Sequence, residues 1–364
     1  MRFQHITAAA MLLVAPAITA PSPEKNADCE ATVKPGQRIQ DAINKAKRGD
    51  RIVVEAGEYH EQLTITTNGI QLIGKPGAHL LPPSTLTPNF CTGLSRNLPP
   101  PRGDYAETDA GICIYGKGFE LAEYVREHKK VNKTGDYIKD VVVTGFAVSN
   151  FTGENIAVIG GKDTRITKNK LTNGGQYGFL TVGSKDTLAA HNVVTSSSLN
   201  FIGLCMDDKA SPRFIDNDVS NYYIAFCTQT SGGEVKRNRA KDCCTGPFVD
   251  PGITGAKIID NTISGRNALC PDEAGAGIVV FGATNTIVEG NTFANVLNNR
   301  TGVGIFVSDD PVSGAKAQGN VFKKNTLRNN DLDIYDATNR TDNVYRRNAC
   351  DSELASLPMG LCDM

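Results

Sequence analysis

Eight asparagines recur along this chain in one local context. A mostly apolar residue lies three positions before each of them, and for the first seven another lies two positions after. The eight are Asn169, Asn192, Asn217, Asn238, Asn261, Asn291, Asn325 and Asn348. Successive intervals are 23, 25, 21, 23, 30, 34 and 23 residues. A repeat of this length is typical of a solenoid, in which each unit buries its apolar face only against its neighbours.

The asparagine itself has a physical role in such a repeat. At a sharp bend between short strands, its amide can bond the bend backbone and the asparagine one coil away. This satisfies polar groups inside the stack that would otherwise be buried without partners. The repeat therefore predicts one continuous coil with the eight asparagines in a single inward column.

The first twenty residues have the features of a secretory signal peptide. Arg2 provides the positive start, residues 8–17 are apolar, and Ala20 is a small residue suited to cleavage. The apolar stretch is too short to span a bilayer. We therefore expect an exported, extracellular protein whose mature part, residues 21–364, is one domain. Four Asn-X-Thr sequons fit a glycoprotein, with acceptors Asn132, Asn150, Asn299 and Asn339.

Charge argues against several classes of partner. The chain has 38 Lys and Arg against 39 Asp and Glu, a formal net charge of −1, and no basic cluster. This balance indicates neither a nucleic acid nor a membrane surface as partner, and we expect a monomer. No Cys/His spacing resembles a zinc site, so we expect no metal and no cofactor.

Ten cysteines, an even number in an oxidising compartment, predict disulfides. Cys205 and Cys227 have matching strand contexts, about 4.8 Å apart by strand spacing, and form either a disulfide or two stacked thiols. Two local pairs are further candidates: Cys91 with Cys113, and Cys350 with Cys362. No partner is assigned to Cys29, Cys243, Cys244 or Cys270.

Two segments depart from the repeat. Residues 37–46 have apolar side chains at the spacing of a short amphipathic helix, which would cap the open end of the coil. Residues 80–135 contain proline clusters and a polar, helix-like run, so we expect a long insertion there. Regular coils then continue to about residue 348, and residues 349–364 form a C-terminal tail.

A second set of strands, such as residues 202–206, is apolar on both alternating faces. A strand with one solvent-exposed face should alternate apolar and polar side chains. We therefore expect another part of the chain to cover the outer face of these strands. We expect the proline-rich insertion to fold over them as a flap, with the main pocket between the flap and the coil. The strands to be covered carry Leu180, Cys205, Cys227 and Val279.

These features resemble the right-handed parallel β-helix superfamily. Residues 37–59 resemble the entry of pectate-lyase-like and alginate-epimerase-like chains. The Ile-X-X-Asn-X-hydrophobic repeat resembles that of carbohydrate-binding proteins and sugar hydrolases, and it also occurs in a periplasmic copper-maturation protein. The resemblance covers roughly residues 37–348. It implies an all-β fold, but members include lyases, hydrolases, epimerases, esterases and non-catalytic proteins.

In enzymes of this superfamily the site usually lies on the outer face of a strand stack, so acids at matching strand ends are candidates. Asp207 and Asp208 follow one strand, and Asp250 follows another. Asp208 and Asp250 lie two coils apart, about 9–10 Å, near the upper limit for an inverting carboxylate pair. We take all three as candidate catalytic residues. The alternative, that they are ordinary turn residues, stays open.

Further candidates are weaker. The chain has no tryptophan, so an aromatic platform for sugar would come from Tyr or Phe, and Tyr177 and Tyr223 are candidates against ordinary packing. The histidines are scattered along the sequence. Polygalacturonase-type Gly-His-Gly and Arg-Ile-Lys segments are absent, as is the arginine and aspartate set of pectate lyases. Polar candidates for ligand contact are Asp109, Lys209, Asp309 and Asp310.

Three functions remain open at this point. The first is a carbohydrate-active enzyme (lyase, hydrolase or epimerase) that acts on an extracellular, possibly acidic, polysaccharide. The second is an isomerase or cyclase that binds an apolar small molecule between the strand stack and the flap. The third is a non-catalytic carbohydrate-binding or cell-wall surface protein.

Overall fold

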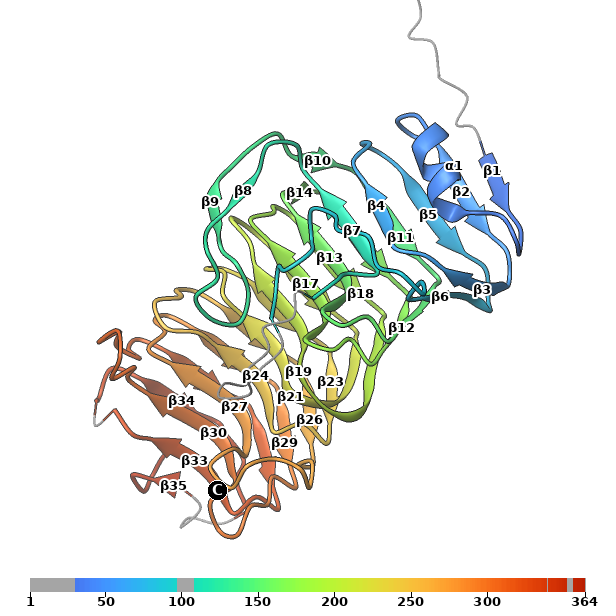
Figure 1. Cartoon of the computed structure of the whole chain (residues 1–364). Helices are drawn as coiled ribbons and strands as arrows, with labels where there is room; N and C mark the ends of the chain where they lie inside the picture. Colours follow the sequence, from blue (N-terminus) through green and yellow to red (C-terminus); the bar gives the residue numbers. More distant parts are fainter. Residues whose placement is uncertain (1–29, 97–107, 339, 352–355, 364) are drawn as a thin grey trace, which may run out of the picture.

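The computed structural model describes residues 30–96, 108–338, 340–351 and 356–363. The chain winds into an elongated parallel β-helix (Figure 1), which confirms the predicted fold class. The long sheets are parallel, because each strand pairs with the equivalent strand of the next coil. The coils form three faces, separated by bends.

The first face is a 12-stranded sheet with short, regular strands. In most of these strands the middle residue points inward, as Ile166 and Phe214 do, and is fully buried. In spatial order the strands are β1 (Glu30–Val33), β2 (Arg51–Val54), β5 (Gln71–Gly74), β11 (Val142–Thr144), β15 (Arg165–Thr167), β18 (Leu188–Ala190), β20 (Arg213–Ile215), β22 (Glu234–Lys236), β25 (Lys257–Ile259), β28 (Ile287–Glu289), β31 (Val321–Lys323) and β34 (Val344–Arg346).

The second and third faces belong to one 19-stranded sheet, because β19 (Val193–Asp207) and β21 (Asp218–Thr228) run through both. The second face also contains β3 (Gly57–His60), β6 (Ala78–Leu81), β12 (Ala147–Ser149), β16 (Lys170–Thr172), β23 (Arg239–Lys241), β26 (Thr262–Ser264), β29 (Thr292–Ala294) and β32 (Thr326–Arg328). The third face also contains β4 (Leu63–Ile65), β7 (Ile112–Tyr115), β13 (Glu154–Ile159), β17 (Tyr177–Val182), β24 (Thr245–Val249), β27 (Ala276–Phe281), β30 (Val303–Ser308), β33 (Leu332–Asp336) and β35 (Ser356–Leu357).

The helix expected at residues 37–46 is α1 (Ile39–Lys45), at the N-terminal end of the coil (Figure 1). Ile39 and Ile43 are its buried residues. The carboxylate of Glu61 accepts hydrogen bonds from the backbone N–H groups of Ile39 (2.8 Å) and Gln40 (3.2 Å). This carboxylate satisfies two of the N–H groups that a helix N-terminus leaves free.

The eight asparagines form one inward column, as predicted, and each is at most 2% exposed. Asn192 illustrates the contacts. Its Nδ2 donates to Oδ1 of Asn217 (2.9 Å) and to the carbonyl of Ile166 (2.8 Å). The residue before it, His191, has a φ of 56°, and this left-handed residue makes the bend. The ladder satisfies bend groups inside the coil, where no water reaches them.

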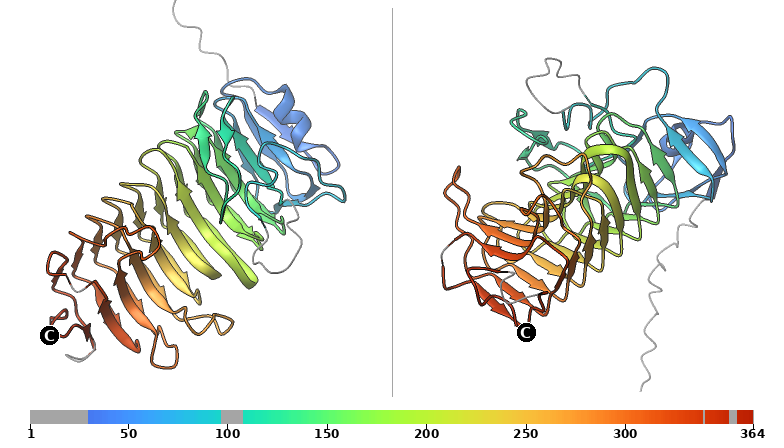
Figure 2. Two further views of the ribbon diagram at one scale, coloured as in Figure 1. Left: turned by 60° about the vertical axis from the view of Figure 1, so that its left-hand side comes forward. Right: turned by 90° about the horizontal axis from the view of Figure 1, so that it is seen from below.

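The segment 80–135 consists of two loops separated by a strand of the coil, β7. The first loop precedes β7, and the second carries β8 (Glu120–Leu121) and β9 (Val131–Lys133), which pair antiparallel. A further pair, β10 (Ile138–Lys139) and β14 (Gly161–Lys162), follows the second loop. We call the two loops together the flap. Figures 1 and 2 show the β8–β9 loop extending over neighbouring coils.

The flap covers part of the third face and creates a second core there. Leu94 and Phe119 of the flap pack in one cluster with outward side chains of the third face. Those side chains include Leu180, Cys205 and Cys227, which are at most 1% exposed. This contact explains why these strands are apolar on both faces. Val279, which we expected under the flap, lies outside this cluster.

The predicted signal peptide and Cys29 lie outside the described residues, as do residues 97–107 of the flap and the sequon acceptor Asn339. The other three acceptors, Asn132, Asn150 and Asn299, are exposed.

Candidate active site

Three polar side chains stand in one outward column at the ends of adjacent third-face strands. Asp207 ends β19, Gln229 follows β21 and Asp250 follows β24. The register pairs Met206 with Thr228, and Thr228 with Val249, so these three next residues occupy equivalent positions in successive coils. The parallel coil thus brings together residues that are far apart in the sequence.

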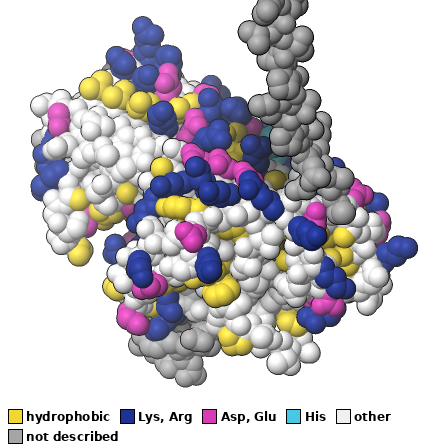
Figure 3. All heavy atoms as spheres, turned by 90° about the horizontal axis from the view of Figure 1, so that it is seen from above, with side chains coloured by type: hydrophobic (Ala, Val, Ile, Leu, Met, Phe, Trp, Pro, Cys, Tyr) yellow, Lys and Arg dark blue, Asp and Glu magenta, His cyan; other side chains and the backbone are white. Residues whose placement is uncertain are grey.

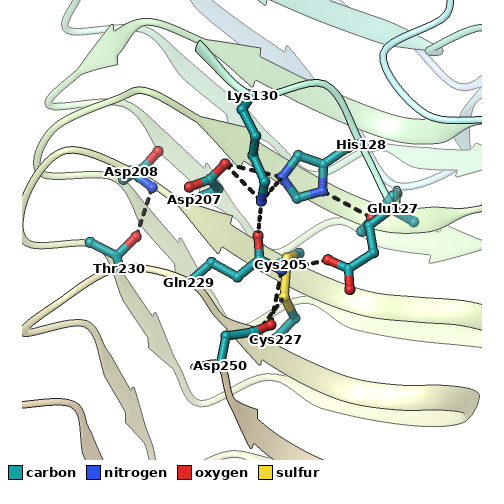
Figure 4. The surroundings of a disulfide bond; sticks show 11 residues. Glu127, His128, Lys130, Cys205, Asp207, Asp208, Cys227, Gln229, Thr230 and Asp250 are labelled. Carbon is teal, nitrogen blue, oxygen red and sulfur yellow. Dashed lines mark hydrogen bonds and ion pairs between the residues drawn. A yellow bond between two sulfur atoms is a disulfide. The ribbon is translucent and has the colours of Figure 1, made fainter. Parts of the chain in front are cut away.

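The second loop of the flap places a histidine and a lysine on this column (Figure 4). Nε2 of His128 lies 3.2 Å from Oδ2 of Asp207, and Nζ of Lys130 lies 3.2 Å from the same oxygen. Lys130 also donates to Oε1 of Gln229. The amide nitrogen of Gln229 donates to Oδ1 of Asp250 at 3.3 Å. A chain of hydrogen bonds therefore links the two aspartates.

His128 is 1% exposed and is held on both sides. Its Nδ1 lies 3.0 Å from the hydroxyl of Tyr177, which is itself fully buried. Burial lowers the pKa of His128, although its hydrogen bond with Asp207 acts in the opposite direction. A neutral ring fits these contacts if Nε2–H donates to Asp207 and Nδ1 accepts from Tyr177. His128 then orients the Asp207 carboxylate.

Asp207 and Asp250 have opposite pKa shifts. Burial alone would raise the pKa of Asp207, but the His128 hydrogen bond and the charge of Lys130 outweigh it, and the net pKa is lowered. For Asp250, burial raises the pKa to about 8, and the nearby charge of Glu127 adds to this effect. At neutral pH Asp207 is therefore a carboxylate and Asp250 a carboxylic acid.

The two aspartates line an open cavity of about 480 Å³, which we call the acid cavity. Its wall includes Arg126 and Lys130 from the flap, and Asp310 from the loop after β30. On the face shown in Figure 3, side chains of Lys and Arg lie among those of Asp and Glu, which agrees with the net charge of −1.

A second cavity, of about 410 Å³, lies farther along the third face. The flap cluster reaches only its edge, at Ile224, and its floor is largely aromatic, with Phe248, Phe281, Phe306 and Tyr335. We call this cavity the aromatic groove. Phe248 stands two residues before Asp250 on the same coil, so the groove begins where the acid cavity ends.

The structure brings together only some of the residues chosen from the sequence. Asp207, Asp250 and Asp310 line the acid cavity, and Tyr223 lines the aromatic groove. In addition, Asp310 accepts hydrogen bonds from Val312 and Ser313 of its own loop.

The other candidates lie elsewhere. Asp208 is buried and accepts from Thr181 Oγ1 (2.8 Å) and the Ser184 N–H (3.0 Å), so it has the contacts of a bend residue. Lys209 is exposed and lines neither cavity. Tyr177 lies under the flap. Asp109 accepts from Gln62 and Thr92 inside the flap, and Asp309 pairs with Lys316 and Arg340.

Four disulfides link cysteines among the described residues of the coil and its loops. The Cys205–Cys227 bond joins adjacent third-face strands, with Cα atoms 4.5 Å apart, and the two local pairs proposed from the sequence are also bonded. The fourth, Cys244–Cys270, was not predicted, and among the described cysteines Cys243 is free. Sγ of Cys227 lies 3.8 Å from Oδ2 of Asp250, so the first bond is a buried neighbour of this cavity residue (Figure 4).

Sequence reasoning missed the flap's contribution to the site, namely His128, Lys130 and Glu127. That loop lies outside the repeat, so no sequence pattern indicates where it lies relative to the coil. Among the described residues, no group of three or more His, Cys, Asp or Glu side chains is arranged to hold a metal ion. No helix in the described ranges is long and apolar enough to cross a bilayer.

Sequence comparisons agree with the fold. The family described as "Right handed beta helix region" matches residues 202–352, and that of the periplasmic copper-binding protein NosD matches residues 104–274. A search of curated proteins finds no match. Each family match spans less than half of the chain.

Solved structures extend the likeness to most of the chain. The family 28 exopolygalacturonase of Yersinia enterocolitica is 12% identical with a TM-score of 0.54, over 90% of this chain and 77% of that one. The A-module of the mannuronan C-5 epimerase AlgE6 of Azotobacter vinelandii is 13% identical with a TM-score of 0.58, over 85% and 87%. The DFA-IIIase of Arthrobacter chlorophenolicus A6, without its lid, is 12% identical with a TM-score of 0.53, over 88% and 98%.

At such low identity these likenesses show the fold alone. The chain is a right-handed parallel β-helix protein.

Proposed function

We propose that this protein is an exported enzyme that hydrolyses glycosidic bonds in an extracellular polysaccharide, with Asp250 as general acid and Asp207 as general base. One observation carries the proposal: two carboxyl groups line the same open cavity, and their surroundings lower the pKa of Asp207 and raise that of Asp250. Such a separation of pKa values is how enzymes assign acid and base roles to chemically identical groups. The four disulfides support export, because they are typical of proteins from oxidising compartments.

The spacing of the pair favours inversion of configuration. Asp207 and Asp250 are two strand spacings apart, about 9–10 Å between backbones. Inverting glycosidases separate their carboxyl groups by roughly 6.5–9.5 Å, which leaves room for a water molecule beside the sugar. A retaining enzyme would need a shorter distance, about 5–5.5 Å.

The reaction then proceeds in one displacement. The protonated carboxyl of Asp250 donates its proton to the glycosidic oxygen as the bond to the anomeric carbon breaks. The Asp207 carboxylate removes a proton from a water molecule, whose oxygen forms the new bond to the anomeric carbon from the opposite face. The products are two shorter glycans. Asp250 then regains a proton from solvent, and Asp207 releases to solvent the proton that it took from water.

The surrounding residues keep this pair in its working state. His128 and Lys130 hold the Asp207 carboxylate and favour its ionised form. Gln229 separates the two carboxyls and donates to Asp250. Glu127, whose carboxylate accepts from Gln229, favours the protonated form of Asp250 by charge repulsion.

The other functions have less support. A lyase or epimerase also uses an acid and a base, so the products of the reaction, rather than the acid pair, separate these activities from hydrolysis. An isomerase or cyclase under the flap would need space there, but Leu180 and Cys205 are fully buried against the flap. A non-catalytic protein has no use for opposite pKa shifts in an open cavity.

The test is a screen of the secreted protein against a panel of polysaccharides. New reducing ends without absorbance from unsaturated sugars are the expected result, and Asp250→Asn and Asp207→Asn should abolish them. Asp216→Asn is the matched control, because Asp216 also has a lowered pKa beside a cation, Arg237, but lies at the bend after β20, away from the third face. Unsaturated products would identify a lyase, and wild-type activity in both cavity variants would refute the assignment.

A further inference from the structure

The aromatic groove is built from one repeated position of the coil. Phe248, Val279, Phe306 and Tyr335 are register partners on β24, β27, β30 and β33, so they form a single outward column. Two ring pairs stabilise its floor: Phe306 with Tyr335, at 5.6 Å between centroids, and Phe248 with Phe281, at 6.2 Å. Four strands at normal spacing make a floor about 14 Å long, enough for a short oligosaccharide.

The charges of the two cavities differ. None of the residues that line the aromatic groove is Lys, Arg or His, and Glu273 is the only acid among them. The acid cavity, in contrast, has Arg126 and Lys130 in its wall. A carboxylate or sulfate group placed in the groove would lie against Phe and Val side chains without a counter-ion and near a negative charge. Contact with these side chains removes part of the hydration of the charged group and supplies no counter-ion, which is unfavourable.

The two cavities are continuous along the coil. Phe248 lines the groove and Asp250, two residues later, lines the acid cavity. The register pairs Val249 with Val280, which puts Asp250 beside Phe281 of the next coil. A linear glycan cleaved between Asp207 and Asp250 therefore has the groove as its path toward the C-terminal coils.

We propose that the aromatic groove binds an uncharged segment of the substrate, so that the polysaccharide is neutral on this side of the cleaved bond. This inference rests on the proposed function, which places the cleaved bond at the acid pair. The apolar faces of sugar rings pack on Phe306 and Tyr335, while their hydroxyl groups stay in water at the groove's edge. The groove thus selects against polyuronates by the lack of a cation.

The test measures binding separately from catalysis. Asp250→Asn is titrated calorimetrically with neutral galacto-, gluco- and xylo-oligosaccharides, and with galacturonate oligomers of the same length. We expect a neutral series to bind more tightly than the galacturonates. Phe306→Ala in the same background should weaken that binding roughly tenfold, and Phe306→Tyr should restore it. Phe90→Ala is the matched control, since Phe90 is also an accessible ring stacked on a tyrosine, Tyr115, but lies on the flap.

A charge reversal tests the selection directly. Glu273→Lys gives the groove a cation and should increase galacturonate affinity severalfold, with neutral affinity unchanged. The inference is overturned if galacturonates bind more tightly than every neutral series, if no oligosaccharide binds, or if Phe306→Ala behaves like Phe90→Ala. A wild-type protein that binds neutral glycans through Phe306 but cleaves none would instead refute the hydrolase proposal and leave the groove assignment standing.

Discussion

The third face is one column of equivalent positions with two different environments. From β7 to β21 its outward residues Cys113, Ala157, Leu180, Cys205 and Cys227 are at most 1% exposed, because the flap packs on them. From β24 to β33 the same position holds Phe248, Val279, Phe306 and Tyr335, outside the flap cluster. The backbone of the coil continues through both halves, as the views in Figure 2 show, so the halves differ in their outward side chains and in their covering.

The candidate active site lies at the border between these halves. Cys227 is the last residue of the covered column and Phe248 is the first of the open one. The loop between β8 and β9 ends over this border, where His128 and Lys130 meet Asp207. The covered half thus provides a fixed support for the charged residues, while the open half provides space for a long ligand. This division is useful to an enzyme on a polymer, because burial shifts pKa values and an open groove admits a chain.

The largest expected effect is on catalysis at the border. Replacing Asp250 by Asn removes the proton donor, and Asp207→Asn removes the base. Each change should lower kcat by about 10²–10⁴-fold, the usual contribution of a general acid or base. Initial rates on the polysaccharide found in the screen are the measurement. Thermal melts should show both variants folded, and a loss below fivefold would contradict the roles given to them.

The pH dependence of this activity follows from the same two groups. Activity needs a protonated Asp250, so it should fall as the pH rises through about 8. It also needs an ionised Asp207, so the acid limb should lie below the ordinary aspartate range, because the pKa of Asp207 is lowered. A His128→Gln variant, which weakens the support of Asp207, should move the acid limb upward and leave the alkaline limb in place. A shift of the alkaline limb alone would assign the acid and base the other way round.

The two halves should also differ in how much their outward side chains contribute to stability. Leu180→Ala removes a fully buried side chain between coil and flap and should cost about 2–5 kcal/mol of unfolding free energy. Phe306→Ala removes a larger but half-buried ring and should cost about 1 kcal/mol or less. Urea denaturation of both variants measures the difference. Equal losses would mean that the flap does not close the covered half in solution.

The covered half should make stability depend on pH. Burial raises the pKa of Glu154, on β13, from 4.5 to about 7. A carboxyl whose pKa is raised in the folded state contributes to stability as long as it is protonated. This contribution is fully present below pH 4.5 and is lost as the pH rises through about 7. Asp208 and Asp250 act in the same direction, so the wild type should be less stable at pH 8 than at pH 5.

Glu154→Gln keeps the shape of this side chain and removes its ionisation. Between pH 5 and pH 8 the unfolding free energy of the variant should fall by about 2–3 kcal/mol less than that of the wild type. This follows from the linkage between pKa and stability. Denaturation at the two pH values is the measurement, and Glu58→Gln, at an exposed residue of β3, is the control. An unchanged pH dependence in Glu154→Gln would mean that water reaches this carboxyl in solution.

The same contrast explains what the sequence could reveal. The asparagine column was predictable because each coil repeats the local context of its neighbour. Asp207, Asp208 and Asp250 could be proposed from the sequence because matching strand ends are adjacent in a parallel coil, and the carboxylate pair considered there was Asp208 with Asp250. Asp208 was chosen with them, but strand alternation puts it on the other side from Asp207, since Cys205 and Asp207 face outward and Met206 lies in the inner core.

The flap contacts had no such signal. His128 meets Asp207 across 79 residues and Tyr177 across 49, and it does so from a loop without a repeat. Cys270 lies in another insertion, so its bond to Cys244 was equally hidden. The pocket was expected under the flap, but the described flap residues pack tightly there, and both cavities discussed above lie at or beyond its edge.

The smallest expected difference concerns the asparagine column, which runs through both halves unchanged. Asn217, near the covered half, and Asn291, in the open half, each donate Nδ2 to the next asparagine and to a carbonyl of the preceding coil. Replacing either by Leu leaves buried bend groups unpaired and should cost ~1–3 kcal/mol for each unpaired group. Because these two contacts are the same and Asn291 adds only a 3.2 Å bond to the carbonyl of Glu289, the two losses should agree within about 1 kcal/mol. Chemical denaturation measures both, and a much larger loss at Asn217 would mean that the flap also stabilises the inner column, so that covering and coil are not separable.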